Sequence, residues 1–169
     1  MKAISRPKGN FYFIRLILVL AVLLLLVYFF VYFPGQESSF EEEGRVIEVI
    51  DGDTIKLENG EKVRYIGIDT PEIKEEECFA SEAKRKNEEL VKGKIVKFKK
   101  DVSEKDSYGR LLRYVYQDDL FVNLFLVKEG FAVSFPWPPD LKYVDLLNQA
   151  EQKAKEENKG LWSECSRIK

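Results

Sequence analysis

Histidine is absent from this chain of 169 residues. Its absence excludes the Ser-His-Asp triad, metal sites built on histidine, and acid–base mechanisms that use two histidines. Cysteine is scarce, with two residues in the chain. Any catalysis must therefore use carboxylates, arginines, hydroxyl groups or a bound metal ion.

A strong net charge is also missing, since 27 basic and 29 acidic residues give a formal net charge of -2. This balance conceals an asymmetry, because residues 1–33 contain four basic residues and no acidic one. The remaining chain has 23 basic and 29 acidic residues, a net charge of -6. Such a domain would bind a polyanion only through a local basic cleft or a bound cation.

The N-terminal region contains an uncharged apolar run, residues 16–33. At 1.5 Å per residue a helix of this run reaches about 27 Å, close to the roughly 30 Å of a bilayer's hydrocarbon core. Basic residues precede the run, and five aromatic residues occupy its C-terminal end. The pattern predicts a transmembrane signal anchor at 16–33, with residues 1–15 in the cytoplasm and the rest of the chain outside.

Two alternatives to an anchor remain open, a cleaved signal peptide and a buried core helix. A signal peptide has an apolar core of about 7–15 residues that ends in small residues. Bulky aromatics occupy that place here, which favours an uncleaved anchor at the cell membrane, whereas cleavage would give a secreted form. Residues 34–43 predict a solvated linker, and residues 44–169 a single domain.

Carboxylates and an arginine are concentrated in two short segments of that domain, DGDT at 51–54 and RYIGIDTPE at 64–72. Hard divalent cations take carboxylate and carbonyl oxygens, and the arginine fork matches paired phosphate oxygens. Asp-Gly is also a common turn dipeptide, so the first segment alone is ambiguous. In the second, period-2 alternation predicts that Arg64 shares a strand face with Ile66 and Ile68, where a charge needs a partner or a function.

A third segment, DSYGR at 106–110, supplies a second arginine on a predicted turn. The order of these three motifs, followed by GLW at 160–162 near the end of the chain, resembles the staphylococcal nuclease family. The resemblance covers residues 44–163. It implies a five-stranded Greek-key OB-fold barrel with about three helices.

The local patterns are compatible with that fold. Alternation predicts strands at 45–50, 54–57, 62–68, 94–99 and 111–116, with a type I′ turn at Asn59-Gly60. Helical spacing predicts helices at 78–91, 122–129 and 140–157.

The resemblance also implies roles for individual residues. Asp53, Asp69 and the backbone carbonyl of Thr70 would bind Ca²⁺, with Asp51 in the outer shell. Glu72 would position the attacking water or accept its proton. Arg64 and Arg110 would hold the scissile phosphate, and Tyr108 would contact a neighbouring phosphate. From the residues alone, Asp51 is equally well explained as a turn former and Tyr108 as a core residue.

The sequence departs from the family pattern where a Tyr-x-Tyr motif is expected. It has Phe135-Pro136-Trp137-Pro138-Pro139 there, and Ser107 where a lysine is expected. An aromatic face suffices to stack on a base, so Phe135 and Trp137 are candidate substrate contacts. They could equally close the hydrophobic core.

The two cysteines, Cys78 and Cys165, form a candidate disulfide if the domain lies outside the cell. A metal site built on them is disfavoured because other soft ligands are missing.

The function predicted from the resemblance is a monomeric, calcium-dependent nuclease. It would hydrolyse single- or double-stranded DNA and RNA with little sequence specificity and without an obligate protein partner. Two other classes stay open: a catalytically silent OB-fold module that binds nucleic acid or protein at the membrane, and a structural membrane protein.

Overall fold

The computed structural model describes residues 11–32, 40 and 42–166. It divides into two units, residues 1–39 and 40–169. In the first unit, helix α1 (Phe11–Tyr32) contains most of the predicted anchor, whose last residue, Phe33, lies outside the described residues. Within the described part of the chain, no helix has both the length and the apolar character needed to cross a membrane. The anchor stays a prediction. The cytoplasmic location of residues 1–15 and the linker at 34–43 also stay predictions, and both segments lie partly outside the described residues.

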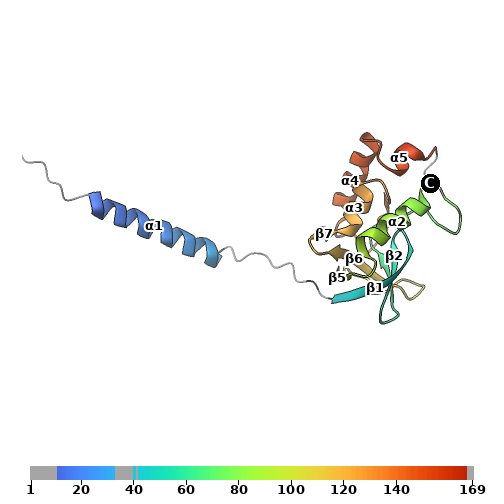
Figure 1. Ribbon diagram of the computed structural model, residues 1–169, viewed down its shortest axis with the longest axis horizontal. Coiled ribbons are helices and arrows are strands. Elements are labelled where there is room, and N and C mark those ends of the chain that lie inside the picture. Colours follow the sequence, from blue (N-terminus) through green and yellow to red (C-terminus); the bar gives the residue numbers. More distant parts are fainter. Residues whose placement is uncertain (1–10, 33–39, 41, 167–169) are drawn as a thin grey trace, which may run out of the picture. The chain divides into compact units, whose positions relative to one another are not determined.

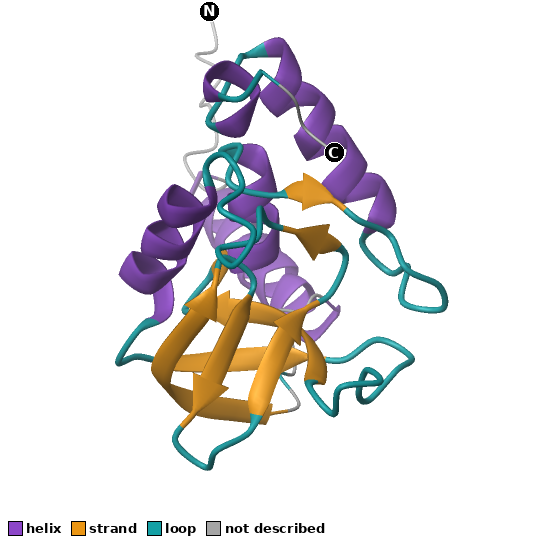
Figure 2. Ribbon diagram, turned by 90° about the vertical axis from the view of Figure 1, so that its right-hand side faces the viewer, coloured by secondary structure: helices purple, strands orange, loops and turns teal. Residues whose placement is uncertain are grey.

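The second unit is built on a closed barrel of five strands, as predicted (Figure 1, Figure 2). The strands are β1 (Glu42–Asp51), β2 (Thr54–Leu57), β3 (Lys62–Tyr65), β5 (Ile95–Lys99) and β6 (Leu111–Gln117). Neighbours pair antiparallel in the order β3-β2-β1-β5-β6, and a parallel pairing of β3 with β6 closes the barrel. Strand β1 pairs with β5 through residues 42–45 and with β2 through residues 46–51, and its register with β2 shifts after Val46 and after Val49.

Branched apolar side chains fill the barrel. Val46, Val63, Val96 and Val115 are fully buried, and they point inward from four different strands. The described residues of this unit form four helices, one more than predicted: α2 (Ala80–Val91), α3 (Val122–Lys128), α4 (Val144–Glu156) and the short α5 (Leu161–Glu164). Three strands of two residues complete it: β4 (Ile68–Asp69), which pairs with β8 (Val133–Ser134), and β7 (Leu120–Phe121), which pairs with β6.

The predicted strand at 62–68 was wrong in its second half. Strand β3 ends at Tyr65, and β4 begins at Ile68 as part of a separate two-stranded sheet. Gly67 between them has φ of 77°, and a Cβ there would lie 2.7 Å from Leu147. The chain turns at this glycine, so the alternation that placed Arg64 on one face with Ile66 and Ile68 does not continue past Tyr65.

Two other local predictions were also wrong. Asn59 does not have the positive φ that a type I′ turn requires. Gly60 has φ of 89°, and its N–H donates to the carbonyl of Leu57 in a three-residue loop. The last long helix begins at Val144 rather than near Asp140, because Asp140 is bridged to Trp137.

A disulfide joins Cys78, just before α2, to Cys165, just after α5. The two residues are 87 positions apart in sequence, with their Cα atoms separated by 5.8 Å. The chain therefore has no free thiol. The bond ties the C-terminal helix to the segment that leads from β4 to α2.

Candidate functional site

Asp53 occupies the turn between β1 and β2, and its side chain is nearly inaccessible to solvent. The carboxylate accepts hydrogen bonds from the Thr70 backbone N–H at 2.9 Å, the Thr70 hydroxyl at 3.1 Å and the Thr54 hydroxyl at 3.1 Å. A Cβ on Gly52 would lie 2.7 Å from the side chain of Thr70. The glycine therefore lets the DGDT turn approach the segment after β4.

Asp51 shapes the same turn, because its Oδ1 accepts a hydrogen bond from the backbone N–H of Asp53 at 3.2 Å. This contact agrees with the turn-forming explanation of Asp51. It leaves a part in an outer coordination shell untested.

The guanidinium of Arg64 connects the two loops of the site. Its Nη1 lies 3.0 Å from Asp53 Oδ2 and donates to the carbonyls of Tyr65 at 2.9 Å and Ile68 at 2.8 Å, while Nη2 donates to Asp69 Oδ1 at 2.7 Å. Only 14% of the side chain is exposed. Arg64 therefore holds Asp53 and Asp69 together as an ion-paired group.

Negative charge is concentrated here. Burial raises the pKa of Asp53 to about 7; Arg64 opposes the rise, and the neighbouring Asp51 and Asp69 add to it. Burial also raises the pKa of Asp69, against the effect of Arg64, and the pKa of Glu72, with further increases from Asp51 and Asp69. A bound cation would relieve this repulsion.

The donor atoms of the site suit a hard cation. Among the described residues, no three or more histidine, cysteine, aspartate or glutamate side chains are grouped to hold a metal ion. The predicted ligands, Asp53, Asp69 and the carbonyl of Thr70, offer oxygen atoms alone, as Ca²⁺ prefers. The Asp69 side chain is 42% exposed and can be reached from solvent. The residues thus fit a calcium ion in donor chemistry.

Glu72 lies in the segment that follows β4, and its side chain is exposed. Its backbone is held by two hydrogen bonds with Glu77: the Glu72 N–H donates to Glu77 Oε2 at 2.8 Å, and the Glu77 N–H donates to the Glu72 carbonyl at 3.2 Å. The position of Glu72 is therefore fixed through its backbone.

Arg110 is held by a short loop before β6. Its Nε donates to Asp106 Oδ2 at 2.6 Å, and Asp106 Oδ1 accepts the backbone N–H groups of Tyr108 and Arg110, both at 2.9 Å. The guanidinium lies 5.4 Å from the ring of Tyr108. Tyr108 is 84% exposed, so the core explanation for this residue was wrong.

A cleft of about 580 Å³ brings the two arginines together with the aromatic segment. Arg64, Tyr108, Arg110, Phe135 and Trp137 all line it. The rings of Phe135 and Trp137 are stacked with centroids 6.1 Å apart, and the side chains are 45% and 67% exposed. They do not close the hydrophobic core, which was the alternative explanation.

The sequence analysis missed Asp140, which lines this cleft and is 5% exposed. Its Oδ1 accepts the backbone N–H groups of Val102 at 2.9 Å and Ser103 at 2.8 Å, which lie at the start of the loop that carries Arg110. Asp140 thereby ties the arginine loop to the aromatic segment. The sequence signal was weak, since an aspartate before an amphipathic helix also predicts a helix start.

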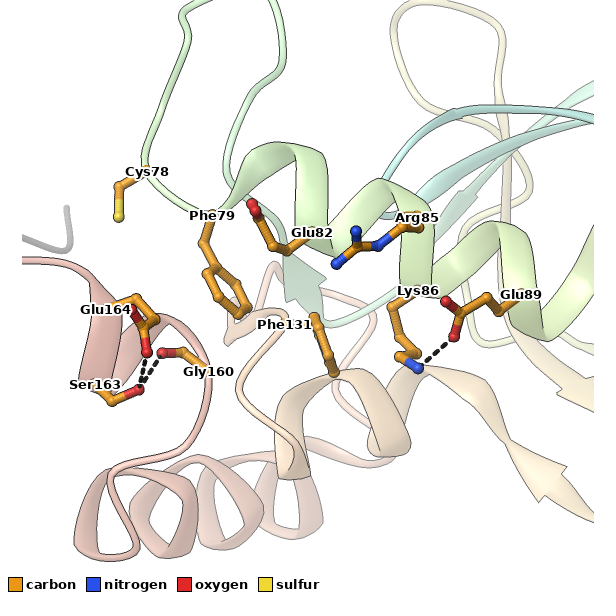
Figure 3. Close-up of a pocket in the computed structure, with 10 residues that line it drawn as sticks. All are labelled: Cys78, Phe79, Glu82, Arg85, Lys86, Glu89, Phe131, Gly160, Ser163 and Glu164. Carbon is orange, nitrogen blue, oxygen red and sulfur yellow. Dashed lines mark hydrogen bonds and ion pairs between the residues drawn. The ribbon is translucent and has the colours of Figure 1, made fainter.

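A second hollow of about 770 Å³ lies between α2 and α5, beside the disulfide (Figure 3). The rings of Phe79 and Phe131 lie in it, stacked with centroids 5.5 Å apart. Among the residues named as candidates from sequence, only Cys78 lines this hollow. The two arginines of the site belong to the first cleft.

The chain is similar to several proteins of known name. A family model described as staphylococcal nuclease homologue matches residues 62–164. The SPbeta prophage-derived endonuclease YokF of Bacillus subtilis (strain 168) is 42% identical over 123 residues, 68% of this chain and 42% of that protein. Endonuclease YncB of the same strain is 42% identical over 128 residues, 70% of this chain and 61% of that protein. The chain thus spans about half the length of these two relatives.

A third relative matches over most of its length. The thermonuclease of Staphylococcus hyicus is 35% identical over 136 residues, which cover 76% of this chain and 80% of that protein. This coverage, together with a family model that matches more than half of the chain, shows that the chain belongs to the staphylococcal nuclease family.

Proposed function

We propose that residues 40–169 form a nuclease that hydrolyses phosphodiester bonds in DNA and RNA. The observation that carries this proposal is the placement of Arg64 and Arg110 in one cleft, with the carboxylates of Asp53 and Asp69 in contact with Arg64. Two guanidinium groups can hold the non-bridging oxygens of one phosphate. The endonuclease and thermonuclease names of the relatives support the same chemistry.

The two arginines would act mainly by stabilising negative charge on the phosphate. Attack on phosphorus adds negative charge to the non-bridging oxygens, and donors fixed in advance stabilise that charge in the transition state. Arg110 is held in place by Asp106 and Arg64 by two backbone carbonyls, so both are oriented before substrate arrives.

We further propose that Asp53, Asp69 and the carbonyl of Thr70 hold a calcium ion. When bound, the ion would supply positive charge at the phosphate and lower the pKa of a coordinated water. Glu72 would orient that water or accept its proton. Its raised pKa brings its carboxylate closer to the range in which it can take up a proton.

Phe135 and Trp137 are proposed to stack on a base of the substrate. Their exposed, parallel rings line the same cleft as both arginines. Stacking accepts every base because each has a π-face, which is consistent with low sequence specificity.

The test is digestion of single-stranded DNA by residues 40–169, with Ca²⁺ or with EGTA. Cleavage that needs the cation and is lost in Arg110→Lys supports the proposal. Arg45→Lys is the matched control, because Arg45 is exposed and donates one hydrogen bond, to the carbonyl of Gly93. Binding of the DNA without cleavage would instead indicate a silent OB-fold module.

We also propose that residues 16–33 anchor the domain to the cell membrane with the catalytic side outward. The supporting observations are the uncharged run and the restriction of flanking basic residues to its N-terminal side. Protease treatment of intact cells should remove the domain. A mature form beginning near Pro34 would contradict the anchor.

A further inference from the structure

Helix α2 carries one buried polar side chain, Asn87, which is fully shielded from solvent. Its Oδ1 accepts a hydrogen bond from the Tyr65 hydroxyl at 2.9 Å, and its Nδ2 donates to the backbone carbonyl of Asp51 at 3.4 Å. One side chain thus contacts the end of β1 and the end of β3. Strand β1 leads into the turn that contains Asp53, and strand β3 contains Arg64.

Tyr65 connects Asn87 to the charged groups of the site. Its backbone N–H donates to the carbonyl of Asp53 at 2.9 Å, and its own carbonyl accepts from Arg64 Nη1 at 2.9 Å. The side chain is 1% exposed, so the ring cannot shift without disturbing the core. Movement of Tyr65 would therefore change the separation of Asp53 and Arg64.

The hydrogen-bond pattern fixes the orientation of the Asn87 amide. Burial raises the pKa of Tyr65, so its hydroxyl keeps its proton and can donate to the amide oxygen. The amide nitrogen is then directed to the carbonyl of Asp51. An apolar residue of similar size at position 87 would remove the bond that the buried Tyr65 hydroxyl donates and the contact with the Asp51 carbonyl.

We propose that Asn87 is a positioning residue of the nuclease site: through Tyr65 and the Asp51 carbonyl, it sets the geometry of Asp53 relative to Arg64. This role rests on the proposed nuclease function. Asn87 acts through other residues, and it lines neither the cleft of the two arginines nor the hollow beside the disulfide.

Asn87→Leu in the full chain is the first test variant, assayed well below its melting temperature. The expected result is a fall in kcat of about tenfold or more with KM nearly unchanged, since small misplacements of catalytic groups are costly. Amide hydrogen exchange at Tyr65 should quicken by about tenfold, because its bond to the Asp53 carbonyl is loosened. Val91→Ala is the matched control: it also removes buried atoms from α2, but Val91 belongs to the hydrophobic core and its side chain has no hydrogen-bonding group.

The double variant Tyr65→Phe/Asn87→Leu separates positioning from stability. It removes the unpaired hydroxyl, so its melting temperature should rise above that of Asn87→Leu while kcat stays low. Recovery of kcat together with stability would overturn the proposal, as would an unchanged kcat in Asn87→Leu. Absence of hydrolysis by the unaltered chain is a different result, which would overturn the proposed function and with it the catalytic role of Asn87.

Discussion

Replacement of Arg64 by lysine should weaken both the fold and the chemistry. Arg64 makes four contacts through two nitrogens, to Asp53, Asp69 and the carbonyls of Tyr65 and Ile68. The ammonium of lysine lacks the planar fork of the guanidinium, so it cannot keep both carboxylate contacts together with the bonds that Arg64 donates to these two carbonyls.

The cost can be estimated from these contacts. Hydrogen bonds to charged groups contribute about 1.5–3 kcal/mol each, and the contact with Asp69 contributes less because that carboxylate is 42% exposed. We therefore expect a loss of about 3 kcal/mol in the free energy of unfolding without a divalent cation. For a domain of this size that corresponds to a melting temperature lower by about 10 °C.

Calcium should reduce this difference, because a bound cation would neutralise the same aspartates that Arg64 holds. Differential scanning calorimetry of the unaltered domain and of Arg64→Lys, each with Ca²⁺ or EGTA, measures both effects. Arg45→Lys serves as the control and should change stability by less than about 0.5 kcal/mol. Equal melting temperatures for Arg64→Lys and the unaltered domain in EGTA, or a gap that widens in calcium, would refute the reasoning.

Turnover gives a second readout of the same change. We expect kcat of Arg64→Lys to fall by about 100-fold or more, since loss of one preorganised donor to a developing charge has effects of that order. A change confined to KM would show that the arginine only binds substrate.

Four further outcomes are expected. Ca²⁺ should support turnover better than Mg²⁺, because Mg²⁺ gives up its waters reluctantly and demands near-ideal octahedral geometry; equal rates after chelation would contradict that assignment. Reduction of the Cys78–Cys165 disulfide should lower the melting temperature without abolishing activity, and two reactive thiols in the denatured, non-reduced protein would reject the bond. Hydrogen bonds from Arg113 lower the pKa of Glu104. The stability that Glu104 contributes should therefore be fully present above its unfolded pKa of about 4.3 and be lost as the pH falls through its lower folded pKa. The melting temperature of Glu104→Gln should accordingly change less on acid titration than that of the unaltered domain. Trp137→Ala should raise KM for single-stranded DNA by about tenfold with a smaller change in kcat, and an unchanged KM would remove this ring from the substrate site.

The sequence predicted the barrel well because alternation and turn signals act locally. All five barrel strands were placed to within three residues at each end. The largest error at a C-terminal end is in β3, which was extended through Gly67, since an apolar residue on each side of the glycine imitates a continuous strand. A positive φ and close packing against Leu147, which decide the turn, are properties of the folded chain.

The sequence predicted the charged residues of the candidate site but not the residues that hold its segments in place. Asp53, Arg64 and Asp69 occur in short motifs, and the structure brings them into contact. Asn87 and Asp140 contact partners 36 and 38 positions away, so no local pattern indicates them. The catalytic roles of the charged residues stay predictions until they are assayed.

The acidic balance of the domain and a polyanionic substrate can be reconciled at the site itself. Arg64 is shared between two aspartates, and Arg110 is paired with Asp106, so each guanidinium is largely neutralised by its own partners. Lys105 also lines the cleft, and its Nζ lies 3.7 Å from Glu61 Oε1, so the cleft offers little unpaired positive charge to a phosphate. A divalent cation on Asp53 and Asp69 would neutralise these carboxylates and weaken their hold on Arg64, which could then interact with substrate. The cation would then serve electrostatic attraction as well as chemistry, and a domain with a net charge of -6 beyond residue 33 should bind nucleic acid more tightly with the cation than without it.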